Sequence, residues 1–195
     1  MTAMTSEAGT EEELLQSWAW DPEKFAREAL FFKPSTQQQV GFAEIRKLVQ
    51  ARLRKIRGDK PQEDDAIYLA KLGLSIMSGQ GTGKDAICAV LILWFLTCFP
   101  FPKVLVTATT FTQVKDNLWA EIHKWLRSTD GDGNESPIKN MFTVSGDKIY
   151  LTEHKGKEWF AVARTANPRE SAEEQAETLA GRHEDYMMVV VDEAA

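Results

Sequence analysis

A glycine-rich octapeptide at residues 78–85, with the sequence SGQGTGKD, constrains the fold of this chain more than any other feature. An apolar stretch at residues 72–77 precedes it, and a strongly apolar run with helical character follows it at residues 86–98. In a strand, a glycine loop ending in Gly-Lys and a helix, backbone N–H groups and the positive end of the helix dipole converge on a phosphate. The octapeptide therefore predicts a phosphate-binding loop inside an α/β fold.

The octapeptide matches the P-loop consensus G-x-x-x-x-G-K-[ST] in part. Gly83 and Lys84 occupy the fixed positions, whereas Ser78 stands at the first glycine and Asp85 at the hydroxyl residue. Lys84 would reach the outer phosphates as a point charge. A glycine-rich turn with an incidental lysine is the structural alternative. The residues expected to bind nucleotide in this loop are Ser78, Gly79, Gln80, Gly81, Thr82, Gly83, Lys84 and Asp85.

A second motif combines an apolar run at residues 187–191 with Asp192 and Glu193 directly after it. The pattern predicts a buried strand that delivers two carboxylates to its carboxyl end, the edge where open α/β sheets bind ligands. Asp192 would hold Mg²⁺, directly or through water, and Glu193 would orient and deprotonate the attacking water. Asp85 is a second candidate for the metal, because a carboxylate adds a hard oxygen ligand. A strand that ends in two solvated acids is the structural alternative.

The composition narrows the class of protein. A length of 195 residues suggests one domain with appendages. The net charge of -6 shows that the chain as a whole lacks the excess positive charge typical of nucleic-acid-binding proteins. A local basic patch that binds DNA is compatible with this net charge. The longest apolar run, residues 86–101, is shorter than the ~20 residues of a membrane span, so no membrane partner is expected. Cys88 and Cys98 would lie ~15 Å apart on the predicted helix, too far for a disulfide, which fits a reducing, intracellular setting.

The chain is expected to comprise three parts: a disordered tail at residues 1–12, a helical segment at 13–66 and a P-loop core at 67–195. The predicted helices of the second part are residues 13–20, 22–30 and 37–56, the last capped by Ser35 or Thr36, with a short helix or loop at 63–72. The helix at 37–56 and the residue after it carry a group of cations that forms either a solvated face or a contact with a phosphate backbone. These cations are Arg46, Lys47, Arg52, Arg54, Lys55 and Arg57.

The core is predicted to contain a mostly parallel sheet flanked by helices. Its expected strands are residues 72–77, 103–108, 142–144, 148–151, 159–164 and 187–191, with a hairpin across 152–157. Its expected helices are residues 86–98, 113–126 and 170–179, and residues 128–137 should form an exposed loop. His183 is expected to make hydrogen bonds in a loop, and neither a zinc site nor a catalytic triad is indicated.

Four blocks, in this order along the chain, resemble the N-terminal ATPase part of the large terminase subunit of tailed bacteriophages and prophages. The first two blocks are the Pro-Ser-Thr-Gln-Gln-Gln segment at residues 34–39 and the variant P-loop at 78–84. The third is the segment at residues 106–114 with Trp119 and Trp125, and the fourth is the Gly-x-His segment at 179–183 before the Asp-Glu strand. The resemblance covers residues 31–195.

The resemblance implies an ATPase that uses ATP and Mg²⁺ to drive double-stranded DNA into procapsids in the host cytoplasm. It implies the portal and procapsid and a small terminase subunit as partners, and a homo-oligomeric ring in the full motor. Gln37 or Gln38 would read adenine. An arginine finger is expected to stabilise transition-state charge. The candidates for it are Arg164, Arg169 and Arg182.

The chain departs from the family in two ways. Asp85 replaces the usual Ser or Thr, and the chain does not extend beyond the Asp-Glu strand into a coupling motif, further strands or a nuclease, so nuclease activity is not carried over. A strand from later in sequence is expected between the P-loop strand and the Asp-Glu strand. Unless residues 148–151 or another chain fill that place, the isolated chain is expected to be marginally stable and to hydrolyse ATP slowly.

Two other functions remain open from the sequence. A helicase-like DNA-dependent ATPase also suits the glutamine segment and the Asp-Glu-Ala ending at residues 192–194. A non-catalytic nucleotide-binding assembly module would share the loop without turnover. An ATPase assay with DNA and procapsids separates these functions.

Overall fold

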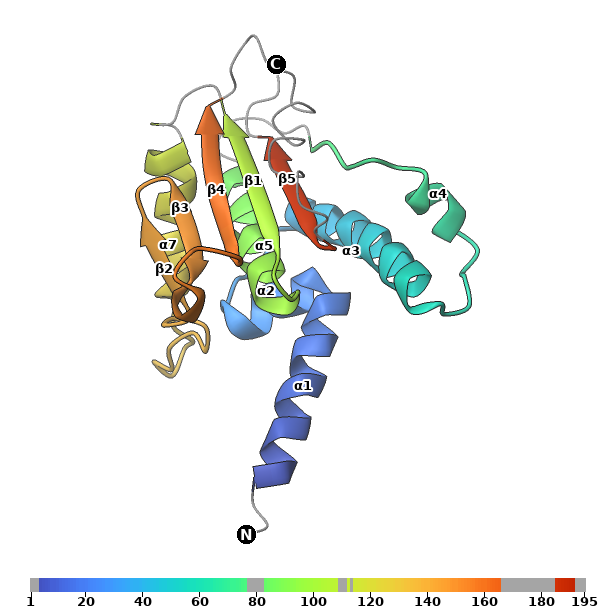
Figure 1. The fold of residues 1–195 in the computed structure, drawn as a ribbon, viewed down its shortest axis with the longest axis horizontal. Helices are drawn as coiled ribbons and strands as arrows, with labels where there is room; N and C mark the ends of the chain where they lie inside the picture. The colour runs from blue at the N-terminus through green and yellow to red at the C-terminus, as the bar shows by residue number, and fades with distance from the viewer. Residues whose placement is uncertain (1–3, 77–82, 109–111, 113, 166–184, 192–195) are drawn as a thin grey trace. The chain divides into compact units, whose positions relative to one another are not determined.

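A computed structural model of the protein describes residues 4–76, 83–108, 112, 114–165 and 185–191 (Figure 1). The chain divides into two compact units. The helical unit consists of Met1–Glu28 and Phe32–Lys84, and the sheet unit consists of Ala29–Phe31 and Asp85–Ala195. The glycine loop therefore ends within the helical unit, and most of the helix that follows it belongs to the sheet unit.

The helices described in the helical unit are α1 (Met4–Trp20), α2 (Pro22–Ala29, whose last residue belongs to the sheet unit), α3 (Thr36–Arg57) and α4 (Asp65–Leu69). The helix α1 extends into the stretch that the sequence predicted to be a disordered tail, because its sequence is rich in Glu, Ala and Leu, which favour helix. The Oδ1 atom of Asp21 accepts hydrogen bonds from the backbone N–H of Glu23 and Lys24, so Asp21 caps α2 as its position before Pro22 predicted.

Both ends of α3 are capped, which confirms the long helix predicted at residues 37–56. The Ser35 side chain accepts a hydrogen bond from Gln38 N, and the Gln38 side chain accepts one from Ser35 N, which completes a capping box. Gly58 ends the helix at φ 71°, a left-handed conformation that favours glycine. Because these signals are local, the sequence located this helix correctly.

The segment at residues 71–76 is not a strand, which corrects the prediction of a strand leading into the glycine loop. Leu72 is 99% exposed and Ile76 is 48% exposed, so the apolar side chains of this segment do not enter a sheet. Leu74 packs against a cluster of Leu48, Ala51 and Tyr68 on α3 and α4. The segment is therefore anchored by a side chain on the helices and not by a hydrogen-bonded ladder.

The sheet unit contains a five-stranded sheet with the strand order β2-β3-β4-β1-β5. The strands are β1 (Lys103–Ala108), β2 (Phe142–Ser145), β3 (Lys148–Leu151), β4 (Phe160–Thr165) and β5 (Met187–Val191). The central strand β1 is parallel to both β4 and β5, whereas β2 pairs antiparallel with β3 and β3 pairs antiparallel with β4. The predicted α/β class is confirmed, but the sheet is mixed, so the prediction of a mostly parallel sheet is not confirmed.

The burial of β1 explains its central place. Val104, Leu105 and Val106 are all at most 1% exposed, which is typical of a strand covered on both faces. The hairpin predicted between residues 148–151 and 159–164 is confirmed as β3 and β4. A second hairpin joins β2 to β3 through Gly146, whose positive φ of 56° favours glycine in a short turn.

Two helical stretches of the sheet unit begin near the predicted positions. The helix α5 (Lys84–Cys98) is apolar around its circumference and largely buried, as such a sequence requires. A π-helical segment (Val114–Trp119) continues into α7 (Ala120–Leu126), where the sequence predicted one regular helix. The Trp119 indole N–H donates to the carbonyl of Gly146 at 3.1 Å, which ties this helical stretch to the β2–β3 turn.

Some predictions fall outside the residues that the structure describes. These are the helix at residues 170–179, the hydrogen bonds expected of His183 in a loop, and the carboxylates Asp192 and Glu193. Among the described helices, none is both long and apolar enough to cross a membrane.

Candidate nucleotide site

The end of the glycine loop enters α5 in the way the sequence predicts. Gly83 has a φ of 77°, a left-handed conformation that favours glycine, and α5 begins at the next residue, Lys84. Lys84 and Asp85 are both half-buried, and neither side chain makes a hydrogen bond or ion pair with another described residue. The first N–H groups of this 15-residue helix lack partners within the helix, so they can donate hydrogen bonds to an anion at this end.

The preceding part of the loop, Ser78, Gly79, Gln80, Gly81 and Thr82, lies outside the described residues. The helix half of the predicted strand–loop–helix context is therefore present, while the strand half is replaced by the irregular segment at 71–76. The binding of nucleotide by these loop residues stays a prediction.

The two glutamines predicted to lie near adenine have different environments. Gln37 is exposed, whereas Gln38 is 9% exposed and its amide group has two partners. Gln38 Oε1 accepts from Ser35 N at 2.9 Å, and Gln38 Nε2 donates to Gly83 O at 3.2 Å. The structure therefore brings Gln38 to the end of the glycine loop, 45 residues away in sequence.

Sequence reasoning missed this contact of Gln38. The spacing of Ser35 and Gln38 is the S-x-x-Q signature of a capping box, and it could have shown that the amide oxygen is committed to the start of α3. No sequence signal indicated that the amide nitrogen reaches Gly83, because that contact depends on tertiary structure.

The parallel strands end at a common edge, as the position of the Asp-Glu motif requires. Val191, the last residue of β5, is aligned with Thr107 of β1, and Thr107 is also aligned with Arg164 of β4. Asp192 and Glu193 follow Val191 directly in sequence and lie outside the described residues. Their proposed roles toward Mg²⁺ and water remain predictions.

Among the three arginines considered as fingers, Arg164 is the one within the described residues; Arg169 and Arg182 are not. Arg164 Nη1 lies 3.0 Å from Asp147 Oδ2, and both side chains are about half exposed. Exposed ion pairs contribute ~0–1 kcal/mol. Arg164 could therefore leave Asp147 at little cost, and its role as a finger stays a prediction.

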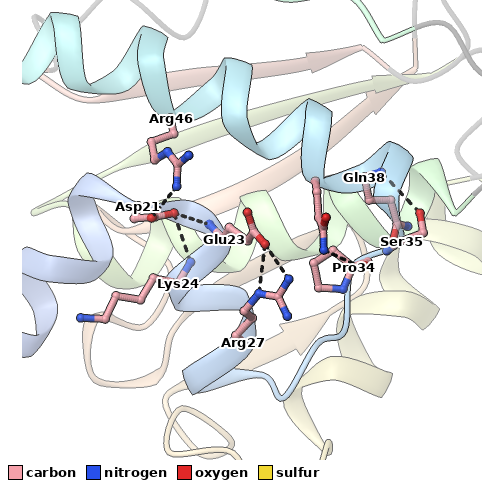
Figure 2. Close-up of polar contacts among 9 residues, drawn as sticks. Asp21, Glu23, Lys24, Arg27, Pro34, Ser35, Gln38 and Arg46 are labelled. Carbon is pink, nitrogen blue, oxygen red and sulfur yellow. Dashed lines mark hydrogen bonds and ion pairs between the residues drawn. The ribbon is translucent and has the colours of Figure 1, made fainter.

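Most of the basic side chains on α3 have partners within the helical unit. Arg46 pairs with Asp21 (Figure 2), and Lys47 pairs with Glu44. The hydrogen bond between Lys47 and Glu44, together with their opposite charges, lowers the pKa of the Glu44 carboxyl and raises the pKa of the Lys47 ammonium. These contacts favour the interpretation of this face as structural.

The remaining α3 arginines are also engaged. Arg54 binds the buried carboxylate of Asp65 through two hydrogen bonds of 2.8 and 2.5 Å. That guanidinium, with the N–H of Gln62, lowers the pKa of Asp65 to about 2. Arg52 Nη2 donates to the backbone carbonyls of Lys71 and Leu72, at 3.0 and 3.2 Å. The guanidinium of Arg57 stacks over the ring of Trp20, 4.9 Å from its centroid.

The described residues contain no group of three or more His, Cys, Asp or Glu side chains that could hold a metal ion. A pocket of about 340 Å³ is found among charged side chains at the start of α2 and on α3, and none of the predicted nucleotide residues lines it. Its lining residues are Asp21, Glu23, Lys24, Arg27, Glu28 and Arg46. Each acidic side chain is paired with a basic one, so the lining has no excess of one sign.

Comparison with known proteins shows a similarity to a phage protein. The chain is 26% identical over 123 residues to a protein of Enterobacteria phage P7 described as "Probable terminase, large subunit". The matched segment covers 62% of this chain and 23% of that protein, so the chain spans less than a quarter of its length. No family model and no solved structure matches the chain. The similarity supports a terminase-like relationship.

Proposed function

We propose that this chain binds ATP at the loop ending in Gly83 and Lys84 and serves as part of a terminase motor that packages double-stranded DNA. The observation that carries the proposal is the start of α5 at Lys84, directly after a left-handed glycine. The similarity to the phage P7 protein supports the same class of function.

The chemistry of this helix start suits a triphosphate. Unpaired N–H groups and the positive end of the helix dipole favour an anion, and Lys84 adds a full positive charge beside them. The Lys84 side chain is half-buried, so its interaction with a phosphate would be screened less by solvent than that of a surface lysine.

The residues present fit Mg²⁺, which prefers hard oxygen ligands. Asp85 offers a half-buried carboxylate in the first turn of α5, and Asp192 offers a second carboxylate after β5. When bound, Mg²⁺ would neutralise charge on the phosphates. Glu193 would orient the attacking water and accept its proton, and Arg164, Arg169 or Arg182 would stabilise charge on the transferring phosphate.

Further features of the proposal come from the terminase relationship. The partners would be double-stranded DNA, the portal and procapsid and a small terminase subunit, with the motor acting as a homo-oligomeric ring in the host cytoplasm. The α3 face is not proposed as the DNA contact, because Arg46, Lys47, Arg52, Arg54 and Arg57 have partners within the helical unit.

The test is calorimetric titration of ATP with Mg²⁺ into wild type, Lys84→Ala and Lys60→Ala. Lys60 is an exposed cation of the same unit and serves as the matched control. Lys84→Ala should weaken ATP binding at least tenfold, whereas Lys60→Ala should bind like wild type. Equal affinity of wild type and Lys84→Ala would contradict the assignment of the loop.

Turnover assays then separate the possible activities of a chain that binds ATP. Hydrolysis stimulated by double-stranded DNA together with procapsids supports a packaging motor. Stimulation by single-stranded DNA alone indicates a helicase-like ATPase. Binding without turnover under all conditions indicates a nucleotide-binding assembly module.

A further inference from the structure

We infer that Gln38 is a positioning residue that holds the last peptide of the glycine loop in place for the triphosphate, and that it does not read adenine. The inference rests on the proposed function and concerns the role of one side chain in it. It starts from the contact between Gln38 Nε2 and Gly83 O at 3.2 Å, within the helical unit.

The two contacts of Gln38 fix the orientation of its amide. Ser35 N is a donor and needs the amide oxygen, whereas Gly83 O is an acceptor and needs the amide nitrogen. Rotating the amide by half a turn would place donor against donor and acceptor against acceptor. Because Gln38 is 9% exposed, water could not easily replace either partner. An adenine base would have to break both contacts to be read by this amide.

Gly83 and Gln38 also fit each other sterically. A Cβ atom built on Gly83 would lie 2.6 Å from Gln38 Nε2, closer than a carbon and a nitrogen can approach. The φ of 77° at Gly83 independently disfavours any residue with a side chain. The close approach of the amide to this backbone is therefore possible only because residue 83 is glycine.

The bond to the Gly83 carbonyl has a consequence for Lys84. The peptide between them is planar and trans, so its N–H points in the direction opposite to its C=O. Gln38 holds the carbonyl and thereby orients the Lys84 N–H away from itself. Lys84 is the first residue of α5, and its N–H is one of those left without a partner inside the helix. Gln38 thus orients the Lys84 N–H so that it can donate a hydrogen bond to a phosphate oxygen.

Gln37 is free of these constraints. It is exposed, and no hydrogen bond of its side chain to another described residue is seen. If a glutamine of this segment reads adenine, Gln37 is the one with an available amide.

The test compares the affinities of wild type and Gln38→Met for ATP, GTP and inorganic tripolyphosphate, each with Mg²⁺. Methionine has a similar length and no charge, and it cannot donate to Gly83 O. A positioning role predicts that all three ligands lose affinity by the same factor, about tenfold or more. A loss confined to ATP, with GTP and tripolyphosphate unchanged, would show base reading and overturn the inference.

Two further variants separate positioning from capping of α3. Gln38→Glu keeps an oxygen acceptor for Ser35 N but removes the donor to Gly83 O, so it should lose affinity for all three ligands while α3 stays capped. Ser35→Ala removes the hydroxyl cap and leaves both Gln38 contacts, so it should lower the Tm without changing affinity. Circular dichroism checks that each variant is folded.

The outcomes of this set are distinct. Wild-type affinity in both Gln38→Met and Gln38→Glu, or equal loss of affinity in Ser35→Ala, would overturn the positioning role. A wild-type chain that binds none of the three ligands would contradict the proposed function itself, and the inference would fall with it.

Discussion

Two short segments of this chain that contain apolar runs have different structures. Residues 71–76 and β5 both precede a motif expected to touch the nucleotide. The strand β5 pairs with β1 along its whole length, with Leu105 aligned to Val189. The segment at 71–76 pairs with no described strand, and two of its carbonyls accept hydrogen bonds from the guanidinium of Arg52.

The difference shows that an apolar run becomes a strand only when another strand satisfies its backbone. In β5 the ladder with β1 supplies those partners. In 71–76 an arginine side chain supplies some of them, and Leu74 provides the packing contact. One segment is held mainly by its backbone and the other mainly by side chains, and each mode of attachment can be tested separately.

The largest expected effect is the loss of the β5 ladder. Successive N–H groups of a strand point to opposite edges, so Met188→Pro or Val189→Pro must remove one of the bonds to β1. At least one of them should cost about 3 kcal/mol of unfolding free energy. Ser75→Pro, in the segment without a ladder, should change it by less than about 0.5 kcal/mol. Urea unfolding of the three variants checks this, and full tolerance of both β5 prolines would contradict the pairing.

A smaller effect is expected from acid, which should weaken the helical unit and leave β5 alone. The folded-state pKa of Asp65 is about 2, below its usual 3.8, so its pairing with Arg54 stabilises the fold above about pH 4. That stabilisation is lost as the pH falls from about 4 toward 2. The residues of β5 carry no titratable side chain.

The variant Asp65→Asn should lower the Tm at pH 7, and its difference from wild type should shrink as the pH approaches 2. Asp64→Asn, at the exposed neighbouring position, is the control and should follow wild type. A difference between Asp65→Asn and wild type that stays constant from pH 7 to pH 2 would exclude the ion pair as its cause. Thermal melts followed by circular dichroism at each pH measure it.

The smallest expected effect concerns the packing of the irregular segment. Leu74→Ala removes a partly buried side chain from the cluster of Leu48, Ala51 and Tyr68 and should cost about 1–2 kcal/mol. Leu72 is 99% exposed, so Leu72→Ala should be close to neutral. If the two leucines instead prove equally important in urea unfolding, residues 71–76 have a different arrangement, such as a strand.

The sequence predicted the elements whose signals are local. The cap at Ser35 and the glycine at Gly58 mark α3, and the apolar run after the loop marks α5. The strand β1 was predicted from its β-branched residues, and the hairpin of β3 and β4 from its spacing. These predictions succeeded because propensity, capping and periodicity act over a few residues.

The features that the sequence did not predict depend on distant partners. Whether residues 72–77 form a strand depends on a neighbouring strand, which no local pattern encodes. The mixed sheet arises because β3 lies between β2 and β4, so the local hairpins occupy one side of the sheet and the parallel pairs the other. The contact of Gln38 with Gly83 was missed for the same reason, because its partners are 45 residues apart.

The strand order also sets the order in which the sheet can assemble. The hairpins β2–β3 and β3–β4 join segments that are close in sequence, so they close short loops. The pairings of β1 with β4 and with β5 close long loops and must form later. During synthesis on the ribosome, β1 is made early but acquires its β5 partner only after residue 191 has emerged. Until then one edge of this buried apolar strand lacks a partner, and an unpaired apolar edge is the kind of surface through which partly folded chains associate.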